Sequence, residues 1–205
     1  MEDKIQQPQR VFRLNLEKYG LSHLDGKNIL NLSDSDLDAF LNALGNDDIS
    51  INVPIPFTPQ NVKELLSYGV CRKCGGCCIP NPANPGSPGV EVFDDELKII
   101  AHYLETSYDT LKENTREGKN RDNPWPLDEV IGTRLLPLPC TFYDEKTKDC
   151  KVYQVRPLVC TIYPIILGEA DDSLDIKVDC DYGKEIAENA IKNLKEKFPD
   201  LILRI

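Results

Sequence analysis

Histidine is the scarcest of the residues that usually carry enzymatic chemistry in this chain. Two histidines, His23 and His102, occur among 205 residues, beside one methionine and one tryptophan. Metal-dependent hydrolases need histidine or carboxylate ligands beside a base, and triad hydrolases need a histidine next to a nucleophile. Neither arrangement, nor a phosphate-binding glycine loop, is visible in the sequence. Conventional hydrolase chemistry is therefore disfavoured, and we expect each histidine to be structural or on the surface.

Long apolar runs and positive charge are also in short supply. The most apolar stretch, residues 161–167, is interrupted by Pro164, whereas a membrane-spanning helix needs about 20 apolar residues. The N-terminus lacks the cationic segment and apolar run of a signal peptide. With 24 basic against 34 acidic residues and a net charge of −10, the chain would repel a phosphate backbone. We therefore expect a cytoplasmic protein that neither spans a membrane nor binds nucleic acid.

Cysteine, by contrast, is abundant. The eight cysteines form one close group of four and four more at wide spacing: Cys71, Cys74, Cys77, Cys78, Cys140, Cys150, Cys160 and Cys180. In a reducing cytosol such a cluster more often binds metal than forms disulfides, and adjacent Cys77 and Cys78 cannot easily bond to each other. Clustered thiolates are typical ligands of zinc and of iron–sulfur clusters. The sequence therefore predicts that all eight cysteines ligate metal, in one or two sites.

The helix and strand signals predict an α+β fold. It is mostly helical, with a few short strands and long irregular loops organised around the cysteine-ligated metal. Residues 1–60 contain no cysteine and form a predicted small acidic helical region, and residues 61–205 form the predicted metal-binding domain. Ser33 and Thr58 are good helix caps, and Gly45 is a predicted helix stop.

Further elements are expected after the first cysteine group. They are a strand at 90–93, helices beginning at Asp94 and at Ser107, a strand at 174–178 and a helix at 182–197 whose buried stripe ends at Phe198. A turn at 145–149 predicts a hairpin that brings Cys140 and Cys150 together. The lone Trp125 lies in a proline-rich loop, where it either gates a site or packs under the loop.

The first cysteine group has partly ferredoxin-like spacing. Cys71, Cys74 and Cys77 match the first three ligands of a bacterial ferredoxin run, but no fourth ligand follows at the ferredoxin position. The two glycines between Cys74 and Cys77 would let the backbone approach the sulfurs. Adjacent side chains in a tight loop usually diverge, so we expect Cys77 and Cys78 to serve two sites, or to be one ligand and one neighbouring thiol. The working hypothesis groups the first three with one distant cysteine, and Cys78 with the remaining three.

A Cys-x-x-Tyr unit recurs every ten residues in the second half of the chain, ending at Tyr143, Tyr153 and Tyr163. These rings either pack against the metal, where they exclude water and offer phenol hydrogen bonds, or form a core that shares the phase of the cysteines. Arg156 either donates to cluster sulfur, binds an anion or is an ordinary ion-pair partner. We take Tyr153, Tyr163 and Arg156 as candidate cofactor-binding residues.

Taken in order, these motifs resemble those of the YkgJ-like CxxCxxCC family of zinc- or iron-chelating cysteine-cluster proteins. The matching residues are Cys71, Cys74, Cys77 and Cys78, then Pro139 and Cys140, Cys150 with Tyr153, Arg156 and Pro157 with Cys160, and Tyr163 with Pro164. The resemblance covers about residues 65–182 and implies metal binding. A related domain in flagellin lysine N-methylases implies protein methylation as a further alternative, although the chain has no glycine-rich loop suited to S-adenosylmethionine.

Three functional classes follow. The first is an iron–sulfur protein with one or two clusters, of the 4Fe–4S type, that transfers electrons to a protein redox partner or assists a redox enzyme. The second is a structural zinc module for protein interaction. The third is an enzyme, such as a methylase relative, that uses the metal in catalysis. All-thiolate ligation and the ferredoxin-like start favour the first class. Oligomeric state and catalytic activity do not follow from the sequence.

Overall fold

The computed structural model describes residues 14–82, 85, 89–118, 133–168 and 173–205. Within these residues the chain is an α+β protein, as predicted, with six α-helices and eight short strands in three antiparallel sheets. The helices are α1 (Asp34–Asn46), α2 (Pro59–Leu66), α3 (Asp94–Tyr103), α4 (Tyr108–Glu113), α5 (Leu158–Ile162) and α6 (Asp181–Lys197). The strands are β1 (Ser50–Val53), β2 (Val90–Phe93), β3 (Arg116–Glu117), β4 (Thr133–Leu136), β5 (Tyr143–Asp144), β6 (Asp149–Cys150), β7 (Ile165–Leu167) and β8 (Leu174–Lys177).

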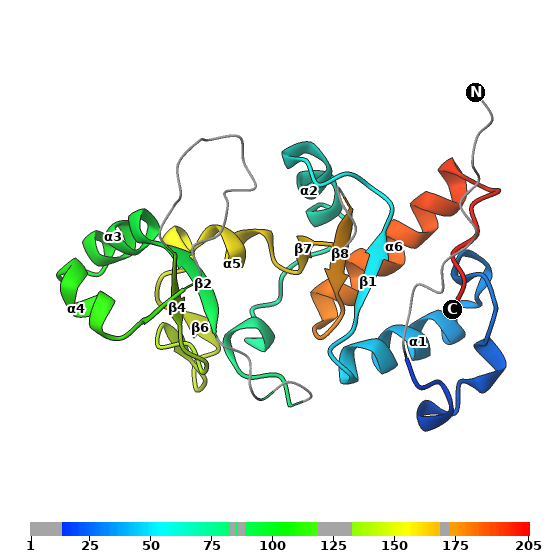
Figure 1. The fold of residues 1–205 in the computed structure, drawn as a ribbon, viewed down its shortest axis with the longest axis horizontal. Coiled ribbons are helices and arrows are strands. Elements are labelled where there is room, and N and C mark those ends of the chain that lie inside the picture. Colours follow the sequence, from blue (N-terminus) through cyan, green and yellow to red (C-terminus); the bar gives the residue numbers. More distant parts are fainter. Residues whose placement is uncertain (1–13, 83–84, 86–88, 119–132, 169–172) are drawn as a thin grey trace. The chain divides into compact units, whose positions relative to one another are not determined.

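The chain divides into two compact units, whose elements are labelled in Figure 1. The terminal unit contains Met1–Arg72 and Pro164–Ile205, and the central unit contains Lys73–Tyr163. Both ends of the chain contribute to the terminal unit, in which β1 pairs with β8. The division into a small acidic helical region at 1–60 and a metal-binding domain at 61–205 stays a prediction.

A three-stranded sheet in the order β1–β8–β7 lies at the centre of the terminal unit. Ile176 of β8 pairs with Ile51 on one side and with Ile165 on the other, and all three side chains are buried. Alternate residues of β1 and β8 are buried, as the period of two in a half-buried strand requires. Helix α6 packs on β8 and on α1. The strand predicted at 174–178 is therefore confirmed.

Both predicted helix caps of the terminal unit are confirmed. Ser33 Oγ accepts a hydrogen bond from the Asp36 amide (3.2 Å) at the start of α1, and Thr58 Oγ1 accepts one from the Asn61 amide (3.2 Å) at the start of α2. Gly45, predicted as a helix stop, lies inside the last turn of α1. A Cβ there would overlap the carbonyl oxygen of Val178, so the position needs glycine for close backbone approach.

Helix α6 confirms the helix predicted at 182–197. Its predicted apolar stripe is buried through Leu194, but Phe198 is 56% exposed and does not belong to it. The physical reason is that Phe198 follows the last helical residue with φ −135° and ψ 70°. The helical period that carries the stripe inward therefore no longer applies to its side chain.

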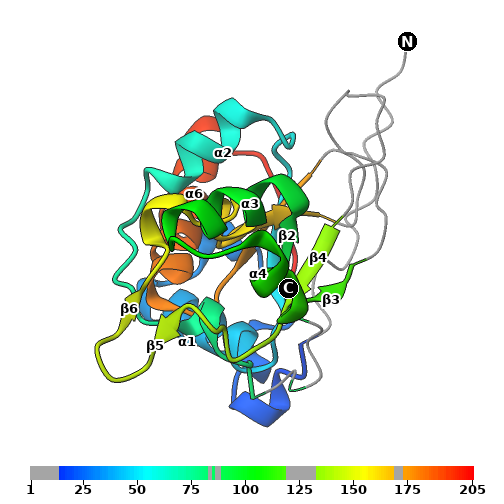
Figure 2. The ribbon, with the colours of Figure 1, turned by 90° about the vertical axis from the view of Figure 1, so that its left-hand side faces the viewer.

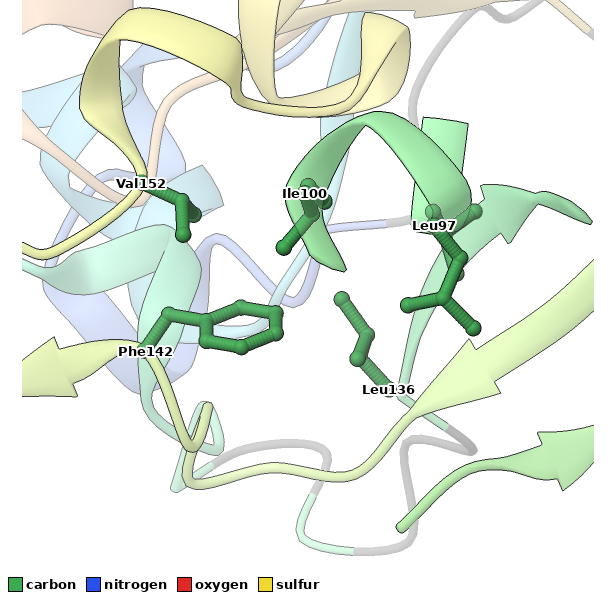
Figure 3. Packing of buried hydrophobic residues seen from close by; sticks show 6 residues of the cluster. Leu97, Ile100, Leu136, Phe142 and Val152 are labelled. Atoms are coloured by element: carbon green, nitrogen blue, oxygen red, sulfur yellow. The ribbon is translucent and has the colours of Figure 1, made fainter. Parts of the chain in front are cut away.

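The central unit places α3 directly after β2, against the sheet of order β2–β4–β3. Figure 3 shows its core, in which Leu97 and Ile100 of α3 meet Leu136 of β4, with Phe142 and Val152 from the segments beside the hairpin. The strand at 90–93 and the helix after it are confirmed. The cap of α3 differs from the predicted Asp94, because Glu96 reaches back to the Phe93 amide (2.9 Å).

Strands β5 and β6 form the predicted hairpin, which extends away from the β2–β4–β3 sheet (Figure 2). In its register Tyr143, and not Cys140, faces Cys150. The predicted helix from Ser107 is the short α4, which Ser107 caps through the Thr110 amide (3.0 Å). Trp125 lies outside the described residues. None of the helices in the described residues is long and apolar enough to span a bilayer.

Candidate metal centre

The first cysteine group is a tight loop shaped by Gly75. This glycine has φ +83° and precedes a 3₁₀ turn, Gly76–Cys78. A Cβ at position 75 would overlap the phenol of Tyr143, which donates a hydrogen bond from its hydroxyl to the Cys74 carbonyl oxygen (3.2 Å). The glycine thus serves two needs at once, a left-handed backbone and close contact with an aromatic ring. The sequence indicated the glycine but not its partner.

Backbone hydrogen bonds hold the loop and attach it to the second half of the chain. The Cys78 amide donates to the Gly75 carbonyl oxygen (2.8 Å), and the Cys140 amide donates to the Cys78 carbonyl oxygen (2.7 Å). The Gly76 amide points at sulfur and lies 3.5 Å from Cys74 Sγ. Cys140 therefore lies beside the loop although 62 residues of sequence separate it from Cys78.

The adjacent cysteines Cys77 and Cys78 do not diverge as expected. Their Sγ atoms lie 3.7 Å apart and both side chains are half-buried. Both residues lie in the short 3₁₀ turn Gly76–Cys78, so the two thiols come from one turn of backbone. Two thiolates bound to one tetrahedral zinc at about 2.3 Å would be about 3.8 Å apart. The pair therefore has the spacing of two ligands that share one ion.

Three more cysteines reach the same unit from separate elements. Cys150 lies in β6, Cys160 lies in α5, and Cys140 precedes the hairpin. Cys140 and Cys150 pack against the hydrophobic core of the central unit. Core packing therefore holds Cys140 and Cys150 in place.

Glu96 fixes the helix that carries Cys160. One carboxylate oxygen accepts from the Leu158 amide at the start of α5 (2.6 Å), and the other accepts from the Phe93 amide at the start of α3 (2.9 Å). A negative charge at a helix N-terminus is favourable because it meets the positive end of the helix dipole. This residue was not predicted, since nothing in its local sequence indicates contact with a segment 62 residues away.

The thiols of the central unit act on one another electrostatically. The hydrogen bond with Cys77 raises the pKa of the Cys78 thiol, and burial and the charges of Cys77, Cys140 and Cys160 raise it further. Burial raises the pKa of Cys160 to about 12, with further increases from Cys77, Cys140 and Cys150. Burial also raises the pKa of Cys140 and of Cys150, and Cys77 adds to both. Cys77 thus interacts with each of the other four.

Arg156 is a cation whose charge acts on the thiols of the central unit. Its charge lowers the pKa of Cys150 and of Cys160, opposing the effect of burial. The guanidinium carbon lies 4.3 Å from the ring centroid of Tyr153, and Lys73 Nζ lies 4.5 Å from the same centroid. Two cations therefore lie within cation–π distance of the Tyr153 ring. Tyr163, the third candidate, follows the last residue of α5 and is half-buried.

Cys71 and Cys180 belong to the terminal unit. Cys180 caps α6, because its Sγ accepts a hydrogen bond from the Gly183 amide (3.4 Å). Cys71 is exposed, and its neighbour Arg72 lies 3.7 Å from Asp181 in the first turn of the same helix. The structure thus brings six of the eight predicted ligands into the central unit and two into the terminal unit.

The donor set fits a thiophilic metal, although it does not form a ready coordination shell. No group of three or more His, Cys, Asp or Glu side chains stands in position to hold an ion in the described part of the chain. All eight cysteines lie in that part and carry thiols and not disulfides. The histidines take no part, since His102 is exposed on α3 and His23 pairs with Asp36 at 3.0 Å. Sulfur is therefore the available ligand, and it suits zinc, copper(I) and iron–sulfur clusters.

Comparison with known proteins gives the same chemistry. Residues 70–187, more than half of the chain, match the CxxCxxCC family, described as a "putative zinc- or iron-chelating domain". The uncharacterized protein MJ0661 of Methanocaldococcus jannaschii is 31% identical over 140 residues, which cover 65% of this chain and 68% of that protein. No solved structure matches. The chain therefore belongs to the CxxCxxCC family of zinc- or iron-chelating domains.

Proposed function

We propose that the chain is an iron–sulfur protein that transfers electrons or assists a redox enzyme. The observation that carries the proposal is the set of six thiols in the central unit, Cys74, Cys77, Cys78, Cys140, Cys150 and Cys160. A single structural zinc needs four ligands and is complete with them. An iron–sulfur cluster also takes four cysteine ligands, so the six thiols provide one full set and leave two that could tune the cluster or join a second group.

The surroundings of the thiols support a redox role. The Gly76 amide directed at Cys74 Sγ is a hydrogen bond of the kind that tunes cluster potential. Arg156, which acts on Cys150 and Cys160, would offset part of the negative charge of an all-thiolate centre. When bound, the cluster would supply one-electron transfer. Tyr153 and Tyr163 would limit the access of water to it.

The proposed ligands remain the eight predicted cysteines. The six thiols of the central unit would supply the primary ligands, and Cys71 and Cys180 of the terminal unit would be further ligands. Binding would draw the thiols inward and release the protons that their raised pKa values retain. A reducing compartment such as the cytoplasm would keep them available, and a protein redox partner would exchange the electrons.

A structural zinc site is the second candidate, and one distance favours it. The 3.7 Å between Cys77 Sγ and Cys78 Sγ is close to the separation of two thiolates on one zinc. In that case the centre would be redox-silent and would hold the loop, the hairpin and α5 together. Its role would then be protein interaction.

Anaerobic purification distinguishes the two. The iron–sulfur proposal expects a brown protein with broad visible absorption and equal amounts of iron and acid-labile sulfide. A colourless protein that retains stoichiometric zinc through dialysis would refute it and establish the second candidate. Single Cys→Ser variants of the six thiols then test the ligand set, with Cys71→Ser and Cys180→Ser as the comparison from the terminal unit.

A further inference from the structure

The terminal unit contains a pocket that takes no part in the metal centre. Its volume is about 270 Å³, and residues of α2, of α6 and of the segment 54–56 line it. Leu65, Ala190 and Leu194 line it and are each exposed by 3% or less. Phe198, 56% exposed, also lines it. The pocket therefore offers an apolar surface of the kind that ligand sites use.

Hydrogen bonds join four polar side chains of the pocket to one another. Asn193 Nδ2 donates to Tyr68 Oη (2.8 Å), and the Tyr68 hydroxyl donates to Glu64 Oε1 (2.7 Å). Lys197 Nζ donates to the same Glu64 oxygen (3.3 Å). All four residues line the pocket. One carboxylate and one ammonium group are thus held beside an apolar floor.

Both charged groups have hydrogen-bonding capacity to spare. The two hydrogen bonds to Glu64 use Oε1, so that Oε2 has no partner among the described residues. Lys197 Nζ uses one of its three N–H groups. The Tyr68 hydroxyl, and then Lys197, lower the pKa of Glu64, which is therefore charged at neutral pH. Burial raises the pKa of Tyr68 to about 12, so the phenol keeps its proton.

We propose that this pocket binds a free apolar α-amino acid of about the size of leucine. The ligand's ammonium group would pair with Glu64 Oε2, its carboxylate with Lys197 and the Asn193 amide, and its side chain would cover Leu65 and Leu194. An apolar cavity of about 150 Å³ binds benzene, which has six non-hydrogen atoms. By the same ratio a volume of about 270 Å³ has room for a ligand of about eleven such atoms, so leucine, with nine, fits. A residue inside a peptide lacks both charges, so it would leave Glu64 and Lys197 without new partners.

Calorimetric titration of the full-length protein with L-leucine tests the proposal. We expect saturable binding of L-leucine. Leucinamide lacks the carboxylate, isocaproate lacks the ammonium group and glycine lacks the side chain, so each should bind at least about tenfold more weakly. Equal binding of leucinamide or isocaproate, or of a peptide with an internal leucine, would overturn it. So would the absence of heat with millimolar L-leucine.

Substitutions in the pocket provide a second, independent test of L-leucine binding. Lys197→Met and Glu64→Gln should each weaken L-leucine binding by about tenfold. Lys195→Met and Glu196→Gln, exposed neighbours on α6 outside the pocket lining, should leave it unchanged. Unfolding curves show whether each variant is folded, and the analogue series on the unaltered protein decides the matter if one is not. Equal effects of the pocket and control variants would also refute the proposal. Metal content has no bearing on either arm.

Discussion

Gly75→Ala is the substitution that most directly tests how the cysteine loop is built. The new alanine would have to adopt φ +83°, and its Cβ would overlap the ring and hydroxyl of Tyr143. A left-handed backbone costs an L-residue about 1–2 kcal/mol. Displacement of Tyr143 would also break its hydrogen bond to the Cys74 carbonyl oxygen, which is worth about 0.5–1.5 kcal/mol.

Gly20→Ala is a matched control for this change. Gly20 has φ +68°, similar to Gly75, but a Cβ there meets nothing within 4 Å. Gly20→Ala should therefore show the backbone cost alone, about 1–2 kcal/mol. Gly75→Ala should cost about 1 kcal/mol more, because it loses the Tyr143 contact as well. Urea unfolding of both variants in the metal-free state measures the difference.

Metal content gives the functional readout of the same pair. Gly75→Ala should bind less metal because Cys74, Cys77 and Cys78 share the distorted loop, whereas Gly20→Ala should bind as much as the unaltered protein. Adding Tyr143→Ala to Gly75→Ala removes the overlapping ring and should restore part of the lost metal binding. If Gly75→Ala and Gly20→Ala behave alike in both assays, the inferred coupling between the loop and Tyr143 is wrong.

Three further predictions concern Glu96, the buried thiols and Cys180. Glu96→Gln should lower the free energy of unfolding by about 1.5–3 kcal/mol, because two amides lose a charged acceptor, while the exposed Asp95→Asn should have little effect in the same urea titration. Cys160 has a pKa of about 12 in the folded state against 9.0 ordinarily. The folded state therefore binds more protons, and the stability of the metal-free protein should fall as pH rises from about 9 to about 12; a flat profile would contradict the burial of this thiol. Cys180→Ser should keep the α6 cap and lose metal, whereas Cys180→Ala should lose metal and about 1 kcal/mol of stability. Full metal loading of Cys180→Ser would remove Cys180 from the ligand set.

Local chemistry explains which parts of the fold could be predicted from the sequence. Ser33 and Thr58 bond to amides three residues away, so a short window contains both partners. The strand at 174–178 and helix α6 follow from apolar periods of two and of 3.6, which also need no distant information. The hairpin between Cys140 and Cys150 follows from the turn residues at its tip.

Long-range contacts explain what could not be predicted. Gly45 was expected to end a helix, but its backbone meets Val178 from the other end of the terminal unit. The partner of Gly75 is Tyr143, and the amide that Glu96 binds belongs to Leu158. Each of these residues has a local pattern that fits a simpler role, because the contact that determines its role is formed only after the chain folds.

The same distinction applies to the metal ligands themselves. Spacing along the chain treats Cys71, Cys74 and Cys77 as equivalent, since the same interval separates each from the next. The fold does not, because Arg72 pairs with Asp181 of the terminal unit and Lys73 pairs with Asp149 of the central unit. The boundary between the units thus falls inside the motif, and its first cysteine lies on the other side from the rest. A cysteine motif therefore gives the type of ligand and their number, while the fold determines which of them a metal can gather.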